Sequence, residues 1–221
     1  MAQGGEKSRF GYRAVADHAW EELSTRPEDF MRRGGALQAG TGLWRMPFFG
    51  RECTIHTGER AIRDNGGKKF GVTVEIVILH YLLRAQEVPL SGRPKSFREF
   101  EGAEAYQDAF RRRVVEPLAR AFGGCPDKFA SAAMSLGGTP ASLRTGDHKF
   151  TVPTVPRIPV TCILWLGDDE VPPSAQVLFD DTADQQVLVE DLAVVGEFVA
   201  YLLVREAGLE LSDVGGIFSY G

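Results

Sequence analysis

The stretch from Cys162 to Asp181 reads CILWLGDDEVPPSAQVLFDD, and it decides the fold that we expect for this chain. Two largely apolar runs, CILWL and AQVLF, flank a glycine, three acidic residues and two prolines. Apolar runs of about four to eight residues that are bounded by turn residues are typical of buried strands. We therefore predict an antiparallel hairpin in which residues 160–166 form a central strand of a sheet.

The turn between these runs carries Asp168, Asp169 and Glu170, and two interpretations of the acids stay open. Gly167 before them and the stiff pair Pro172–Pro173 after them would hold the carboxylates in place, as a site for a divalent cation requires. Prolines after a hairpin tip also block pairing with other strands, and the turn is then only a solvated corner.

Outward from the hairpin, helical spacing dominates the chain before Leu136 and strand-like runs dominate after it. A last helix that begins near Glu190–Asp191 and ends near Gly208 is expected to cover the central strand. Further helices are expected over residues 8–24, 28–33, 73–86, 103–122 and 127–134, with a kink at Pro117. In the first of them the positions at helical spacing are Phe10, Ala14, Val15, His18 and Leu23. Strands are expected over 43–50 and 51–57, and the proline-spaced residues 150–160 are expected to form an extended edge strand or a loop.

These elements predict an α+β fold with antiparallel strand pairs covered by helices, in a single compact protein. We expect residues 1–44 to form an N-terminal helical segment. Residues 45–221 are expected to form a single α+β domain with a helical first half and a strand-rich second half. The deepest core residues are expected in the two strands of the hairpin: Ile163, Leu164, Trp165, Leu178 and Phe179.

Composition excludes several classes of protein. Hydrophobic residues make up 43% of the 221 residues, which is ordinary for a soluble globular chain. The formal net charge of -5 argues against binding to nucleic acid, because Arg111–Arg113 is the only dense basic run. The first residues, MAQGGEKSRFGYR, lack the apolar region of a secretory signal, and the longest apolar run, Val72–Leu83, is interrupted by Glu75 and His80. We expect a cytoplasmic protein with no membrane association.

The three cysteines, Cys53, Cys125 and Cys162, are far apart in the sequence. This spacing argues against a disulfide framework and against a cluster ligated by this chain alone, which normally needs four grouped thiolates. The sequence also contains no nucleophile elbow, phosphate-binding loop, dinucleotide fingerprint or zinc-protease motif. The sequence therefore does not identify a cofactor.

Eight residues are candidates for ligand binding on two alternative grounds. An apolar groove for a flat ligand would use His80, Tyr81 and Trp165, and Arg157, held among prolines, would clamp an anion or pair with the acidic turn. A polar pocket for a divalent metal would instead gather Asp168, Glu170, Asp180 and Glu190. A lone histidine in an apolar helix is more often a hydrogen-bonded core residue than a ligand.

Several segments, taken in order, resemble a bacterial and archaeal family, the domain of unknown function 3786. They are ILHYLLRA, SFREFEG, EPLARAFG, GDHKF, PRIPVTCILWLGDDEVPPSAQVLFD and EDLAVVGE, and the similarity covers about residues 45–205. Members of that family are often fused to, or found beside, four-iron–four-sulfur modules. The resemblance therefore implies a redox context and a possible iron–sulfur partner protein, although this chain lacks clustered cysteines.

Two functions stay open at this point. The first is a ligand-binding or accessory protein that works in a redox or iron–sulfur context. The second is an enzyme that uses acidic residues and a divalent metal. The first is favoured, because no nucleophile, base and orienting group can be named together in the sequence.

Overall fold

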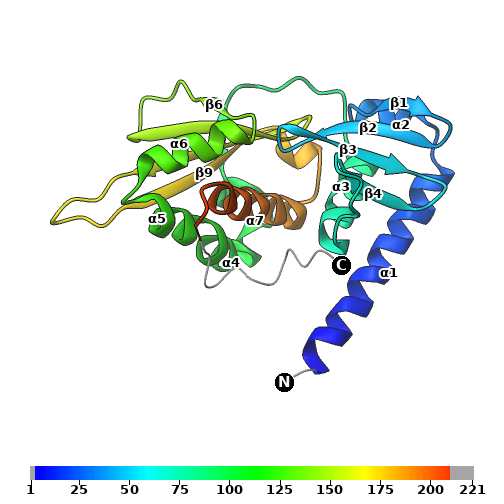
Figure 1. Cartoon of the computed structure of the whole chain (residues 1–221), viewed down its shortest axis with the longest axis horizontal. Helices are drawn as coiled ribbons and strands as arrows, with labels where there is room; N and C mark the ends of the chain where they lie inside the picture. Colours follow the sequence, from blue (N-terminus) through cyan, green and yellow to red (C-terminus); the bar gives the residue numbers. More distant parts are fainter. Residues whose placement is uncertain (1–2, 210–221) are drawn as a thin grey trace. The chain divides into compact units, whose positions relative to one another are not determined.

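The computed structural model describes residues 3–209 and has the expected α+β fold, with two antiparallel sheets and helices packed on them (Figure 1). Its described residues group into two compact units: unit 1 contains 3–47 and 52–87, and unit 2 contains 48–51 and 88–209. The domain boundary expected after residue 44 stays a prediction, because a compact unit is not thereby an independently folding domain.

Unit 1 is built from a four-stranded sheet and three helices. The helices are α1 (Gln3–Thr25), α2 (Asp29–Arg33) and α3 (Val72–Arg84), and the strands are β1 (Leu37–Gly40), β2 (Leu43–Phe48), β3 (Arg51–His56) and β4 (Ala61–Asp64). The strands follow one another in the order β1-β2-β3-β4, and α1 and α2 both pack on α3. Eight residues of α3 are buried, which confirms the mostly buried helix that its apolar run predicted.

The buried face of α1 differs from the one predicted. Val15 and His18 are exposed, whereas the buried residues are Ala16, Ala19, Trp20 and Leu23. These four recur at spacings of three and four and so form one stripe on the helix. Of the predicted positions, Leu23 is buried, Ala14, Val15 and His18 are exposed, and the side chain of Phe10 lies outside the described residues. The prediction passed over Ala16 and Ala19, whose small side chains allow α1 to approach a neighbour closely.

Unit 2 contains a five-stranded antiparallel sheet. Its strands are β5 (Pro94–Ser96), β6 (Thr139–Pro140), β7 (His148–Val155), β8 (Ile158–Trp165) and β9 (Ser174–Asp180), in the order β5-β9-β8-β7-β6. The hairpin predicted from the sequence is β8–β9, and β8 is the central strand, as expected. Strand β7 is not an edge strand, because it pairs with both β8 and β6. Strand β6 pairs only with Phe150 and Thr151 and thus stops before Pro153 of β7, which donates no ladder hydrogen bond.

The helices of unit 2 are α4 (Gln107–Phe110), α5 (Glu116–Phe122), α6 (Pro126–Ser135) and α7 (Val189–Glu206), with short 3-10 turns at Phe97–Glu99, Ala103–Ala105 and Ala183–Gln185. Helix α5 packs on β8 and β9, and α6 and α7 pack on β7. The expected cover of the central strand β8 by the last helix stays a prediction. Between α4 and α5, residues Arg111–Val115 form a π-helical turn. This wider turn ends just before Pro117, whose ring would otherwise meet the carbonyl of Arg113.

The core of unit 2 contains four of the five predicted residues. Ile163, Leu164 and Phe179 are each 1% exposed and Leu178 is 9% exposed. Trp165 is the exception, since it is only half-buried. It pairs with Ser174 at the last position of the β8–β9 ladder, next to the exposed turn. Among the residues that the structure describes, none of the helices is both long and apolar enough to cross a bilayer.

Phe179 packs between Phe100 and Phe110, with ring centroids 6.1 and 6.3 Å away. We expect Phe179→Ala to lower the free energy of unfolding by about 3–5 kcal/mol, because it leaves a cavity among these rings. Urea unfolding followed by circular dichroism measures the loss. Trp165→Ala is the control, and it should cost clearly less. Equal losses in the two variants would contradict the assignment of Phe179 to the core.

Candidate functional site

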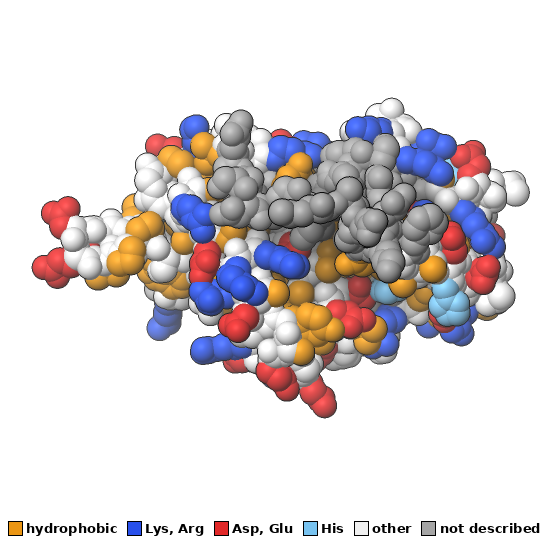
Figure 2. All heavy atoms as spheres, turned by 90° about the horizontal axis from the view of Figure 1, so that it is seen from below, with side chains coloured by type: hydrophobic (Ala, Val, Ile, Leu, Met, Phe, Trp, Pro, Cys, Tyr) orange, Lys and Arg blue, Asp and Glu red, His pale blue; other side chains and the backbone are white. Residues whose placement is uncertain are grey.

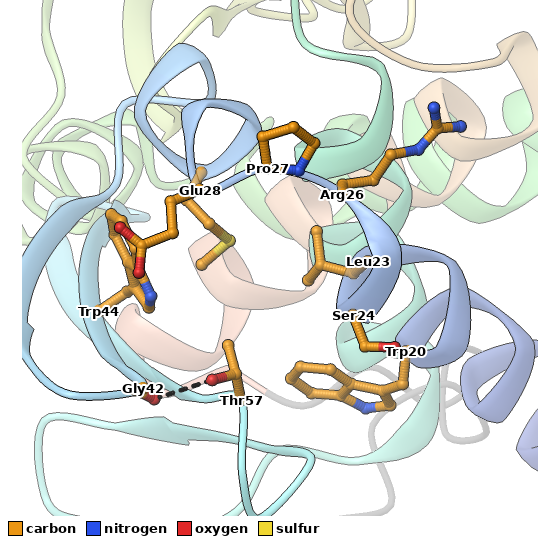
Figure 3. Close-up of a pocket in the computed structure, with 10 residues that line it drawn as sticks. Trp20, Leu23, Ser24, Arg26, Pro27, Glu28, Gly42, Trp44 and Thr57 are labelled. Atoms are coloured by element: carbon orange, nitrogen blue, oxygen red, sulfur yellow. Dashed lines mark hydrogen bonds between the residues drawn. The ribbon is translucent and has the colours of Figure 1, made fainter.

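A pocket of about 180 Å³ lies in unit 1, where the end of α1 and the turn into α2 face the sheet (Figure 3). Buried apolar side chains form its floor and exposed polar residues form its rim. The lining residues are Trp20, Leu23, Ser24, Arg26, Pro27, Glu28, Met31, Gly42, Trp44 and Thr57. We call this cavity the indole pocket, because two tryptophans contribute its largest side chains.

Trp20 comes from α1 and is 2% exposed. Its Nε1 donates a hydrogen bond of 2.6 Å to Oε1 of Glu75 on α3. Figure 3 shows the nitrogen of Trp20 turned away from the other lining residues and the six-membered ring turned toward them. Glu75 is 6% exposed and also accepts from Arg13, at 2.8 Å from Nη1 and 3.4 Å from Nη2. The hydrogen bond to Glu75 raises the pKa of Arg13, which keeps that guanidinium charged.

Trp44 comes from β2 and is also 2% exposed. Its indole nitrogen lies on the side that faces the other lining residues in Figure 3. Among the residues that the structure describes, no acceptor lies within hydrogen-bonding distance of this nitrogen. The guanidinium of Arg32 lies 5.2 Å from the centre of the Trp44 ring, a distance typical of a cation–π contact. Trp44 therefore offers one hydrogen-bond donor to the pocket.

The polar groups of the rim are paired with protein groups. Arg26 forms an ion pair with Glu22, and Glu28 forms one with Arg32. The hydroxyl of Thr57 donates to the carbonyl of Gly42 at 3.2 Å, and that of Ser24 donates to Glu21 at 2.7 Å. Each hydroxyl keeps its oxygen lone pairs as acceptors. The indole pocket is thus apolar and without an unpaired charge of its own.

The residues predicted for an apolar groove fall in different units. His80 and Tyr81 belong to α3 of unit 1, where Tyr81 is buried and donates its hydroxyl to the carbonyl of Gly34 at 3.0 Å. His80 is half-buried. Trp165 belongs to unit 2. The groove itself stays a prediction, while Tyr81 has a structural contact that the sequence did not indicate.

Asp180 lies at the end of β9 and holds the segment that leads into β5. Its carboxylate accepts hydrogen bonds from the backbone N–H groups of Ser91, Gly92 and Thr182, and from the hydroxyl of Thr182 at 2.6 Å. The neighbouring Asp181 forms an ion pair of 2.8 Å with Arg93. Burial by itself would raise the pKa of Asp180, but these hydrogen bonds outweigh it and the pKa lies below its ordinary value. The carboxylate thus connects the end of β9 to residues 91–92 through hydrogen bonds.

Asp168 holds its own turn together. Its Oδ1 accepts from the N–H groups of Glu170 and Val171, at 2.9 and 2.7 Å, and these bonds lower the pKa of the Asp168 carboxyl. Leu166 and Val171 are 39% and 60% exposed beside it. In Figure 2 acidic side chains project at the end of unit 2 that carries the hairpin tip, at the left of the view. The carboxyl of Glu170 is exposed.

The other candidate residues of unit 2 lie apart from this turn. Asp180 and Asp168 sit at opposite ends of β9, and Arg157 and Asp168 sit at opposite ends of β8. Eight residues of strand span roughly 26 Å, so Arg157 does not pair with the acidic turn. Glu190, in the first turn of α7, accepts a hydrogen bond of 2.9 Å from the hydroxyl of Tyr106. Within residues 3–209, no three His, Cys, Asp or Glu side chains are grouped so that they could hold a metal ion.

The sequence reasoning missed the residues that build the indole pocket. The alternation of Trp44, Met46 and Phe48 along β2 is a strand pattern that points all three side chains to one face, and all three are buried. Glu75 stood out only as an interruption of an apolar run. A buried acid in such a run requires a hydrogen-bond or ion-pair partner. The acid within the apolar run was therefore the sequence signal for a buried polar contact.

Comparison with known proteins gives one positive result. Residues 26–202 match the family model described as Domain of unknown function (DUF3786). This match covers most of the chain, and the protein belongs to that family, as its motifs indicated. Trp20 lies before the matched segment and Trp44 lies within it. No curated protein and no solved structure matches the chain.

We expect Asp180→Asn to lower the free energy of unfolding by about 1.5–3 kcal/mol at pH 7, because it removes charge-assisted hydrogen bonds. The folded-state pKa of Asp180 lies below the unfolded value of about 3.9, so the unfolded chain takes up protons first on acidification. The stabilisation is therefore present above about pH 4 and is lost as the pH falls through the folded-state pKa. Urea unfolding between pH 7 and pH 3 should show the cost of the substitution shrinking toward acid.

Glu170→Gln is the matched control for Asp180→Asn, since its carboxyl is exposed at the hairpin tip. It should leave the urea midpoint unchanged at every pH. If the loss of unfolding free energy in Asp180→Asn does not vary with pH, the charged carboxylate of Asp180 does not stabilise the fold through these hydrogen bonds.

Cysteine reactivity follows from burial. Burial raises the pKa of both Cys53 and Cys162 to about 12, and these side chains are 0% and 1% exposed. Cys125 is half-buried at the start of α6. We expect Ellman's reagent at pH 8 to modify Cys125 in the folded protein and to modify Cys53 and Cys162 only in urea, because the thiolate is the reactive form. Reaction of folded Cys125→Ser at the wild-type rate would contradict this expectation.

Proposed function

We propose that this protein binds a small, neutral and largely apolar molecule in the indole pocket, through a hydrogen-bond acceptor on the ligand. The observation that carries the proposal is the indole N–H of Trp44, a donor on a buried side chain that faces a cavity and has no acceptor among the described residues. Among the described residues, Nε1 of Trp44 is not one of the fully buried nitrogens that lack a partner, so solvent reaches it through the pocket, and a ligand acceptor would take the place of that water.

The chemistry of the lining supports a neutral ligand. The charges on the rim are already paired, so the pocket offers no free counter-ion for a strong acid or base. Trp20 and Met31 supply flat or polarisable apolar surface, which suits an aromatic or aliphatic body. Ligand sites are commonly apolar cavities with a few placed polar groups, and the indole pocket has this composition at small size.

The same lining favours binding over catalysis. Its nucleophilic side chains are the hydroxyls of Ser24 and Thr57, and no histidine, lysine or cysteine is among the lining residues. Covalent catalysis by a hydroxyl requires an adjacent general base. The alternative of an enzyme that uses Asp168, Glu170, Asp180 and Glu190 with a divalent metal stays a prediction, and the contacts of these residues do not favour it.

We also propose that the protein works in a redox or iron–sulfur context. The support for this part is the resemblance of the sequence motifs to the family, not the geometry of the pocket. In this view the cluster belongs to a partner protein and this chain is the accessory protein. Purification from its own host without air, followed by native mass spectrometry and an absorption spectrum, tests the association. A chain that purifies alone and colourless would count against an iron–sulfur partner.

The three tryptophans provide a direct test of the ligand site, because each gives one indole N–H signal in a nitrogen–proton correlation spectrum. The probes are acetophenone, which has an aromatic body and a carbonyl acceptor, and ethylbenzene, which has nearly the same shape and no acceptor. We expect acetophenone to shift the Trp44 signal strongly and the Trp20 signal less, and to leave Trp165 of unit 2 unchanged. Ethylbenzene should bind about threefold to tenfold more weakly, because it lacks one hydrogen bond.

The variant Trp44→Phe keeps an aromatic ring and removes the donor. It should bind the two probes with equal affinity. If neither probe shifts Trp44 or Trp20 in the wild-type protein, or if Trp165 shifts most, the indole pocket is not the binding site.

A further inference from the structure

We infer that Glu75, held by Arg13, is the residue that sets the specificity of the indole pocket, because it fixes the orientation of Trp20. The inference rests on the proposed function for its consequence in ligand binding. Its structural part, the orientation of one ring by one carboxylate, can be tested without any ligand.

The carboxylate of Glu75 has two hydrogen-bond partners, Trp20 and Arg13, and these contacts fix its position. One oxygen, Oε1, accepts from the Trp20 indole at 2.6 Å, and the other, Oε2, accepts from Arg13 at 2.8 Å. Arg13 is 45% exposed and Glu75 only 7% exposed at their side chains, so the arginine brings a compensating charge from the surface to a buried acid. A carboxylate at this depth is stable only when its charge is paired and its oxygens are hydrogen-bonded.

The orientation decides which donors the pocket offers. The pocket contains two indoles and could therefore present two N–H groups. Glu75 occupies the one on Trp20, and the ring then turns its apolar edge toward the cavity, as Figure 3 shows. Of the two indole N–H groups, only that of Trp44 is left for a ligand. The pocket then selects a molecule with one acceptor at one end and an apolar body at the other.

Helix packing explains why Glu75 can take this role. Trp20 and Arg13 are both on α1, seven residues apart and hence on the same face, and Glu75 is on α3, against which α1 packs. Arg13 also pairs with Asp17 at 3.0 Å, one turn further along α1. The chain Asp17–Arg13–Glu75–Trp20 thus connects an exposed acid to a wall of the pocket.

The test compares Glu75→Gln with Glu52→Gln, a control on an exposed glutamate of unit 1 that pairs with Arg45 at 3.6 Å. In the wild-type protein we expect the Trp20 indole proton downfield of the Trp44 proton, because its acceptor is charged and close. Glu75→Gln should move the Trp20 proton upfield and lower its nitrogen–proton heteronuclear Overhauser effect, which reports faster motion of the ring. Glu52→Gln should change neither quantity.

Ligand binding supplies the second readout. Glu75→Gln should weaken acetophenone binding about threefold to tenfold, because a mobile Trp20 no longer shapes the apolar end of the cavity. Glu52→Gln should bind both probes like the wild-type protein. An ordered Trp20 ring together with unchanged affinities in Glu75→Gln would overturn the inference.

If Glu75→Gln does not fold, a second variant tests the inference. Trp20→Phe removes the donor and leaves the Glu75–Arg13 pair, and it should weaken acetophenone binding by a similar factor. Wild-type affinity in Trp20→Phe would overturn the inference. If the wild-type protein binds neither probe but Glu75→Gln frees the Trp20 ring, the proposed function fails and the positioning of Trp20 by Glu75 stands.

Discussion

The pairing of the buried Glu75 carboxylate with α1 is the interaction on which the packing of unit 1 depends. Glu75 lies in the apolar helix α3, where a carboxylate needs an opposite charge and hydrogen-bond donors to be stable. Helix α1 supplies the opposite charge with Arg13 and a further donor with Trp20. The contact fixes the rotation of α1 on α3. It places Leu23 and Trp20 toward the sheet and so creates one wall of the indole pocket.

Unit 2 uses a second carboxylate in a comparable way. Asp180 ends the strand β9 and gathers the N–H groups of Ser91, Gly92 and Thr182, which fastens the incoming chain beside β9 before it pairs as β5. Asp168 closes the turn of the same hairpin through backbone N–H groups. Three acids of the most distinctive stretch of this sequence, Asp168, Asp180 and Asp181, are thus engaged in holding the chain, which leaves the aromatic residues of unit 1 as the better candidates for ligand contact.

Family membership and the pocket bear on function in different ways. The match to residues 26–202 includes Trp44 and Glu75 but begins after Trp20, so only part of the pocket lies in the matched segment. A small apolar cavity with one free donor is compatible with an accessory role, because binding of a neutral ligand requires no reactive side chain. The lining residues, rather than the acidic turn, are therefore where the function of this chain is best examined.

By itself the sequence determined the α+β class, the β8–β9 hairpin with β8 at its centre, and the buried helix α3, because strand and helix periodicity and turn residues act over a few neighbours. It also determined family membership. Only the tertiary structure decided that Trp165 is half-buried, that β7 has a partner on each side, and that Glu75 meets Trp20, 55 residues away. The physical reason is that such contacts depend on which faces pack together in space. Local spacing shows that an acid needs a partner, but it does not show which residue supplies one.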